Sequence, residues 1–240
     1  MLYRRRLLFW FLFILVAFTF LKASNGSVTA RADSVALPWS RPPGYRIIYL
    51  IARDAVAPSS LITPVRLEAT LGAQPVHNWD DLVRRDASSP IDALIVHDSA
   101  LPLIDSGWLT NAYQRGVVIG IFDIDVVKLA DSIQDPCITK DSFASEPHPD
   151  HFWMVVSRLV LGQPEDVALI RAASDLCGDE QVAGVQNRAR EILSRSTDSL
   201  FTVNDYNIFA RALADHIAGI KQAKQEFEND AGLTPKRVAP

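Results

Sequence analysis

Residues 46–52, RIIYLIA, decide the fold of this chain together with two similar runs, DALIVH at 92–97 and VVIGIFDI at 117–124. Each run is short, almost continuously apolar and rich in β-branched residues. It lacks the alternation that marks a strand with one exposed face. Such runs are typical of strands buried on both faces, as in a parallel sheet covered by helices. We therefore predict that these runs form the centre of a sheet.

Helix-length segments separate and follow these runs, and their alternation with strands predicts right-handed βαβ units. The predicted fold class is α/β: a three-layer sandwich with a mostly parallel sheet of flavodoxin- or receiver-like strand order, plus C-terminal helices. The α/β domain spans 45–160. Its further predicted elements are helices at 61–71, 80–85, 105–114 and 125–133, a short strand near 75–78, and a fifth strand at 152–160, where the length also allows a helix.

The last third of the chain, 161–230, is predicted to be a helical layer packed on this domain, followed by a tail at 231–240. Helices are expected from Pro164, over 181–195, and from Thr202. The third helix carries an apolar stripe with spacings of three, four and seven. Such a stripe packs on a core or pairs with a second copy, and the first interpretation is favoured. The stripe comprises Tyr206, Phe209, Leu213, Ile217, Ile220 and Phe227.

The N-terminal segment 1–30 is predicted to be a signal peptide or a signal anchor. Three arginines, Arg4 to Arg6, precede an uncharged apolar run at 7–21. Positive charge favours the cytoplasmic side, so the body is expected outside the cytoplasm. As a helix the run is about 22 Å long, between the lengths of signal and anchor segments. Two outcomes stay open: cleavage near Ala30 and secretion, or retention as a single-pass anchor with the N-terminus inside. A Pro-rich spacer follows at 31–44.

The charge of the exported body excludes some partners. Residues after Ala30 hold 20 basic and 28 acidic side chains, a net charge of −8. Nucleic-acid binding needs a basic surface that displaces counterions. We therefore expect no nucleic-acid partner, and no membrane contact beyond residues 7–21 if these are retained.

Two cysteines, Cys137 and Cys177, are expected in an oxidising compartment, where a pair can form a disulfide. The alternative is two separate buried thiols, because sequence spacing does not establish proximity.

Common catalytic motifs are missing from the sequence: there is no glycine-rich phosphate loop, G-x-S-x-G, H-E-x-x-H or C-x-x-C. The absence of these motifs favours a non-catalytic domain that binds a small ligand or a protein partner. No particular cofactor is predicted. An assembly subunit that dimerises through the C-terminal helix is a further alternative.

Polar residues follow the predicted strands at their carboxyl ends, where open α/β sheets bind ligands. Those at the predicted edge are Asp54, His97, Asp98, Asp123 and Asp125. Convergent carboxylates would hold Mg²⁺, so the alternative function is a Mg-dependent hydrolase or phosphatase using Asp98, Asp123 and Asp125. In the simpler interpretation each Asp caps the next helix.

Two segments at this edge resemble known families. VHDSALP at 96–102 resembles the phosphoacceptor region of response-regulator receiver domains, which would make Asp98 the phosphoacceptor, although Arg53 and Asp54 stand where that family has an acidic pair. IFDIDVV at 121–127 resembles the nucleophile motif of haloacid-dehalogenase-type phosphatases. That resemblance implies Asp123 as nucleophile and Asp125 as general acid with Mg²⁺. About seventy domain residues precede this strand, whereas that family begins with it.

The polar, proline-containing loop at 134–151 holds a weak candidate metal site at His148, Asp150 and His151. Imidazole and carboxylate groups suit Zn²⁺, but a structural site needs four ligands and a catalytic site three. A solvated loop is the alternative.

Overall fold

The computed structural model describes residues 44–53, 55, 62–122, 124, 126–135, 152–173, 182–183 and 188–230, all within one compact unit, Trp39–Pro240.

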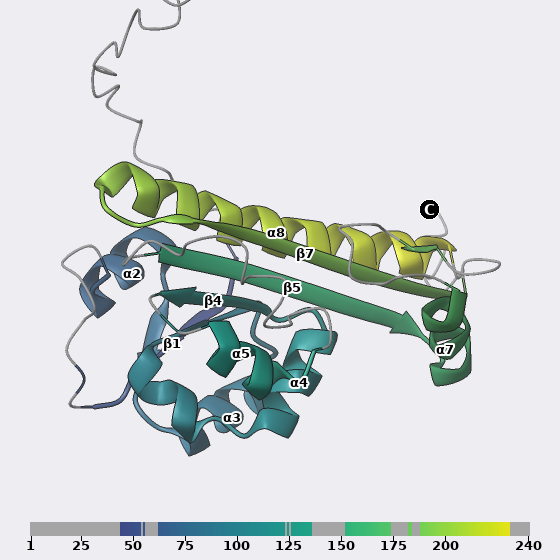
Figure 1. Cartoon of the computed structure of the whole chain (residues 1–240), viewed down its shortest axis with the longest axis horizontal. Helices are drawn as coiled ribbons and strands as arrows, with labels where there is room; N and C mark the ends of the chain where they lie inside the picture. The colour runs from purple at the N-terminus through teal and green to yellow at the C-terminus, as the bar shows by residue number, and fades with distance from the viewer. Residues whose placement is uncertain are drawn as a thin grey trace, which may run out of the picture. The chain divides into compact units, whose positions relative to one another are not determined.

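Among the described residues, four strands form the parallel half of a seven-stranded sheet (Figure 1). They are β1 (Ile47–Leu50), β2 (Gln74–Val76), β3 (Ala93–Val96) and β4 (Val118–Phe122), in the order β2-β1-β3-β4. All residues of β1, β3 and β4 are buried, as expected for strands covered on both faces. The prediction that the three apolar runs are central strands is confirmed.

The other half of the sheet is antiparallel. The strand β5 (Phe152–Gly162) pairs with β4 and with β7 (Ala189–Ser199), and β7 also pairs with the short β6 (Val182–Ala183). Half of the six strand pairings are therefore antiparallel, and the predicted mostly parallel sheet is wrong for this part. The expected strand at 152–160 is present and continues to residue 162.

The strand β5 starts at the edge of the sheet opposite to the one where the preceding helix ends. The helix α5 (Val126–Ile133) runs back from the carboxyl end of β4, and Asp135 beyond it contacts Arg158 in the distal half of β5. Phe152, the start of β5, lies instead at the carboxyl end of β4, because Trp153 pairs with Phe122. The next strand therefore starts at the carboxyl edge and runs antiparallel.

The predicted helix over 181–195 is also wrong, because β6 and the first seven residues of β7 lie in that range. Ala189, Glu191 and Leu193 are buried while the residues between them are more exposed, which is the period of a strand. Glu191 is a polar residue that occupies one of these alternating buried positions. Its burial hides the two-residue period from an analysis of hydrophobicity.

Helices cover both faces of the sheet, as Figure 1 shows. On one face α2 (Pro64–Leu71) and the long α8 (Val203–Asp230) pack on the odd-numbered residues of β1 and β3. On the other face, α3 (Trp79–Ser88), α4 (Ser106–Gln114) and α5 pack on the even-numbered ones. A further helix, α7 (Pro164–Ala173), packs on the β5–β7 ribbon.

The helix α8 docks through its predicted apolar stripe. Five stripe residues are buried in one core cluster with the sheet, namely Tyr206, Phe209, Leu213, Ile217 and Ile220. A Cβ on Gly120, in β4, would lie 3.3 Å from the Phe209 ring. The missing side chain thus allows an aromatic ring to approach the sheet closely. The predicted packing of this stripe on the domain is confirmed for these residues.

Candidate functional site

The carboxyl ends of β1 and β3 meet where the chain leaves the sheet in opposite directions. From β1 the chain passes through α2 to β2 on one side, and from β3 it passes through α4 to β4 on the other. Such a switch point is the usual ligand site of an open α/β sheet. The residues immediately after these two strands are therefore the first candidates for function.

His97 and Ser99 form a polar pair at this switch point. The Ser99 Oγ lies 2.7 Å from the His97 Nδ1, and the Ser99 amide donates to the same nitrogen over 3.1 Å. The Ala52 amide, just after β1, donates to the Ser99 Oγ over 3.2 Å. His97 is 8% exposed and also contacts the Tyr49 ring edge-on. The pair therefore joins the ends of the two strands.

These contacts determine how the His97 ring is protonated. A backbone amide is only a donor, so the Nδ1 that it contacts must be an acceptor. The neutral ring then carries its proton on Nε2, and the 2.7 Å contact is a hydrogen bond from the Ser99 hydroxyl to Nδ1.

Asp98 lies beside this pair but faces solvent. Its carboxylate is 3.8 Å from the Lys128 Nζ of α5, and the two side chains are 54% and 61% exposed. Exposed ion pairs stabilise a fold weakly. The pair therefore offers one anion and one cation to a ligand at the surface, and Asp98 is not held in a carboxylate cluster in the described part of the chain.

Apolar side chains are exposed where α2 and α8 begin. Val65, Phe201 and Val203 are 76%, 58% and 51% exposed. The two helices are in contact there, because the Arg66 guanidinium in the first turn of α2 lies 5.0 Å from the centre of the Tyr206 ring in α8. Exposed apolar surface of this kind is a common feature of protein-binding sites.

The other residues predicted for this edge, Asp54, Asp123 and Asp125, lie outside the described residues. So do the weak metal candidates His148, Asp150 and His151, both cysteines and the whole N-terminal segment. Among the described residues no group of three or more His, Cys, Asp or Glu side chains could hold a metal ion.

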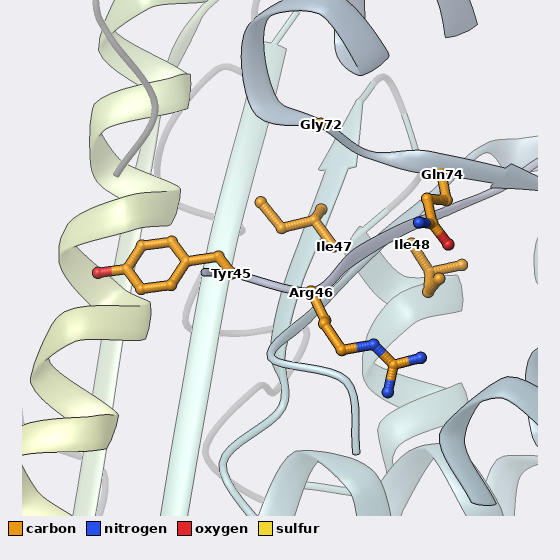
Figure 2. Close-up of a pocket in the computed structure, with 6 residues that line it drawn as sticks. All are labelled: Tyr45, Arg46, Ile47, Ile48, Gly72 and Gln74. Atoms are coloured by element: carbon orange, nitrogen blue, oxygen red, sulfur yellow. The ribbon is translucent and has the colours of Figure 1, made fainter. Parts of the chain in front are cut away.

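A hollow of about 140 Å³ lies at the opposite, amino end of β1 (Figure 2). Its lining includes Tyr45, the start of β1, and the segment from Gly72 to Gln74. The Arg46 guanidinium is already engaged there, donating to the Ser89 carbonyl. The sequence gives no signal for this hollow, since it depends on how the end of α2 meets the sheet.

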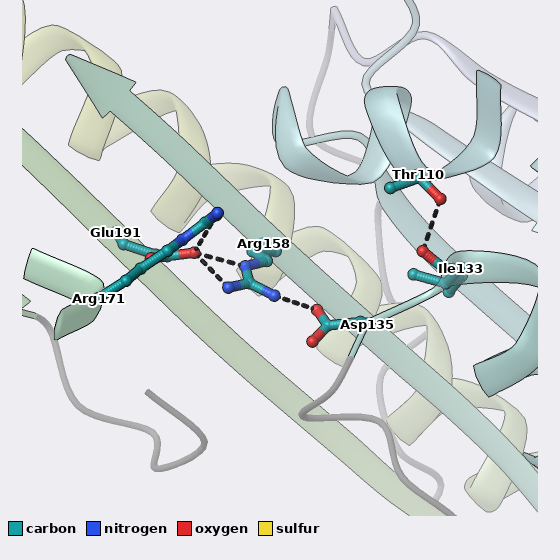
Figure 3. A network of polar contacts seen from close by, with 6 residues as sticks. All are labelled: Thr110, Ile133, Asp135, Arg158, Arg171 and Glu191. Atoms are coloured by element: carbon teal, nitrogen blue, oxygen red, sulfur yellow. Dashed lines mark hydrogen bonds and ion pairs between the residues drawn. The ribbon is translucent and has the colours of Figure 1, made fainter. Parts of the chain in front are cut away.

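A buried ion network crosses the β5–β7 ribbon (Figure 3). The sequence patterns do not predict this network. Arg158 of β5 donates to Asp135 over 2.5 Å and, through Nε, to Glu191 of β7 over 2.6 Å. Arg171 of α7 donates to the same Glu191 over 3.0 and 3.1 Å. The side chains of Asp135, Arg158 and Glu191 are 2%, 6% and 3% exposed.

This network changes the ionisation of its members. Burial raises the pKa of Glu191, but the hydrogen bonds and charges of Arg171 and Arg158 outweigh burial, so the pKa lies below its usual value. Burial, and after it the charge of Asp135, raises the pKa of Tyr113 in α4 well above its usual value. Every charge in the network is paired, which indicates a structural role.

No helix in the described part of the chain has both the length and the apolar character needed to cross a bilayer. Comparison of the chain with protein-family models, with curated proteins and with solved structures found no significant match.

Proposed function

We propose that this protein is an exported or membrane-tethered, non-catalytic domain that binds a small ligand or a protein partner at the carboxyl edge of β1, β3 and β4. The observation that carries the proposal is the exposed Asp98–Lys128 pair at the sheet's switch point. The exposed Val65, Phe201 and Val203 at the start of α2 and α8 extend the surface available to a partner.

The alternative, a Mg-dependent hydrolase, requires several carboxylates around one metal ion. Asp98 is the described member of the predicted set, and its carboxylate forms an ion pair with the cation Lys128. This pairing supports binding over metal-assisted hydrolysis. Dimerisation through α8 has less support, because its apolar stripe is buried against the sheet.

The binding proposal is tested by NMR titration of the ¹⁵N-labelled protein with three probes: inorganic phosphate, a mixture of free amino acids, and glucose. We expect at least one probe to shift amides near Asp98 and Lys128. The variants Lys128→Ala and Asp98→Asn should weaken that response at least about fivefold, the loss of roughly 1 kcal/mol of binding energy.

Gln74→Ala, at the hollow in Figure 2, is the matched control and should leave the response unchanged. The proposal fails if the shifted amides cluster around Tyr45 and Gln74 instead. A Mg²⁺-dependent phosphatase activity that Asp123→Asn abolishes would favour the hydrolase.

A further inference from the structure

We propose that Ser99 is a nucleophile and His97 its general base, so that the carboxyl edge reacts with activated esters. This activity adds catalysis to the proposed ligand binding, so it replaces the non-catalytic part of that proposal, and it uses side chains other than Asp98 and Lys128. No catalytic motif in the sequence indicates this serine–histidine pair. The two residues lie only two positions apart at the end of a strand.

The geometry of the pair is that of an activated hydroxyl. A nucleophilic serine must donate its proton to a base within about 2.6–3.2 Å. The Ser99 Oγ meets this condition at 2.7 Å from the His97 Nδ1. The amide contact at 3.1 Å fixes Nδ1 as the acceptor, so the hydroxyl proton already points at the base.

Two further contacts hold this arrangement in place. The Ala52 amide donates to the Ser99 Oγ, which fixes the oxygen from the side of β1. The His97 ring is 8% exposed and lies edge-on to Tyr49, so its orientation is restricted by packing. Ser99 itself is partly exposed, which an attacking group requires.

A second serine–histidine pair shows why exposure matters. The Ser157 Oγ is 2.9 Å from the His216 Nδ1, between β5 and α8. Ser157 is 1% exposed and His216 is 9% exposed, and the other ring nitrogen of His216 contacts Ser196 at 3.0 Å. No substrate reaches a serine buried in this way, so this pair holds α8 to the sheet.

The proposed reaction transfers the acyl group of an ester to Ser99. The Ser99 oxygen forms a bond to the acyl carbon while its proton passes to His97 Nδ1. The bond from that carbon to the alkoxide leaving group breaks, and the alkoxide takes the proton from Nδ1. Once protonated, Nδ1 cannot accept from the Ser99 amide, which becomes available as a donor. Water then attacks the acyl carbon while one of its protons passes to Nδ1. The bond from that carbon to the Ser99 Oγ breaks, and the Oγ takes the proton from Nδ1, which releases the acid and restores the serine.

The test is labelling of the full-length protein with a fluorophosphonate probe, followed by peptide mass spectrometry. The serine oxygen would form a bond to phosphorus as fluoride leaves, and the proton would pass to His97. We expect modification at Ser99, none after Ser99→Ala, and a rate at least about 100-fold lower after His97→Gln, the usual contribution of a general base.

Two serines in the same protein serve as controls. Ser88 is exposed and donates to a backbone carbonyl, and Ser157 contacts a histidine but is buried. Neither should be labelled. Modification of Ser88 at the same rate as Ser99 would overturn the proposal, and so would absence of label on Ser99.

The wild-type protein offers a second measurement if His97→Gln does not fold. Because only the neutral imidazole accepts a proton, labelling of Ser99 should slow as pH is lowered from about 8 to about 5. A rate that does not change over this range overturns the role of His97. Failure to label leaves the binding proposal untouched, because that proposal is read from Asp98 and Lys128.

Discussion

Arg158 is the residue on which the buried charges of the β5–β7 ribbon depend, since it contacts both Asp135 and Glu191. Breaking a buried ion pair from one side leaves uncompensated charge and destabilises a protein by about 3–5 kcal/mol. We expect Arg158→Met to lower the free energy of unfolding by about this amount, measured by urea denaturation.

Arg84→Ala is the control for this prediction. Arg84 pairs with Asp81 on α3, but its side chain is 74% exposed. Exposed pairs contribute about 0–1 kcal/mol. Equal effects of the two substitutions would mean that the buried network does not stabilise the ribbon.

Glu191 should make stability depend on acid. Its pKa in the folded protein lies below the usual value of 4.5, because Arg171 and Arg158 outweigh the effect of burial. A lowered pKa gives stability that is present above the unfolded value and is lost as pH falls through the folded one. We measure the free energy of unfolding by denaturation from about pH 6 down to about pH 3. Over this range we expect it to decrease less in Glu191→Gln than in the wild type.

At the scale of single residues, the sequence predicts positions better than partners. That His97 and Asp98 follow a buried strand can be read from the apolar run before them. That Ser99 contacts Ala52, 47 residues away, cannot, because it depends on which strands become neighbours. The same limit hides the pairing of Arg158 with Glu191, which are 33 residues apart.

Among the elements, α8 packs closely on β4 where the Phe209 ring lies over Gly120. Gly120→Val would place a side chain against the Phe209 ring and lower the free energy of unfolding by about 1–3 kcal/mol, as overpacking does. Phe209→Ala alone should cost about 3–5 kcal/mol by leaving a cavity. The double variant should cost clearly less than the sum, measured as a thermal-unfolding double-mutant cycle. Strict additivity would contradict this contact.

The elements that sequence patterns predict well are those with one dominant signal. Three apolar runs became β1, β3 and β4, and the helix predicted from Asp105 is α4, for which Asp105 is the N-cap. The strand β7 was missed because Glu191 occupies a buried position that apolar residues normally fill. Its pairing with β5, and the contact of Glu191 with Arg158, involve residues that the local sequence does not contain.

For the whole molecule, the ion network bears on the predicted Cys137–Cys177 disulfide. Asp135 and Arg171 are joined through Arg158 and Glu191, which brings the described chain on the N-terminal side of each cysteine into one region. We expect thiol-alkylation gel shifts of the native protein to find no free thiol, and two after reduction. Two free thiols without reduction would contradict the bridge.

The cellular location of the whole chain is predicted from its N-terminal segment. The predicted signal or anchor at 1–30 implies that residues 44–230 are outside the cytoplasm. An alkaline phosphatase fused after residue 240 should therefore be active in a bacterial host. Deleting residues 4–21 should abolish that activity, and N-terminal sequencing would separate a chain that starts at Arg31 from one that keeps Met1. An active fusion after the deletion would contradict the predicted export.

The position of β1 has a mechanical consequence. It is the first strand after the predicted spacer, and it is hydrogen-bonded to β2 on one side and to β3 on the other. A force applied to the chain before Tyr45 acts along β1, so both ladders must shear together, whereas a strand at the edge could be peeled away one bond at a time. If the N-terminal segment stays in a membrane, the domain is attached through a strand that is hydrogen-bonded on both sides.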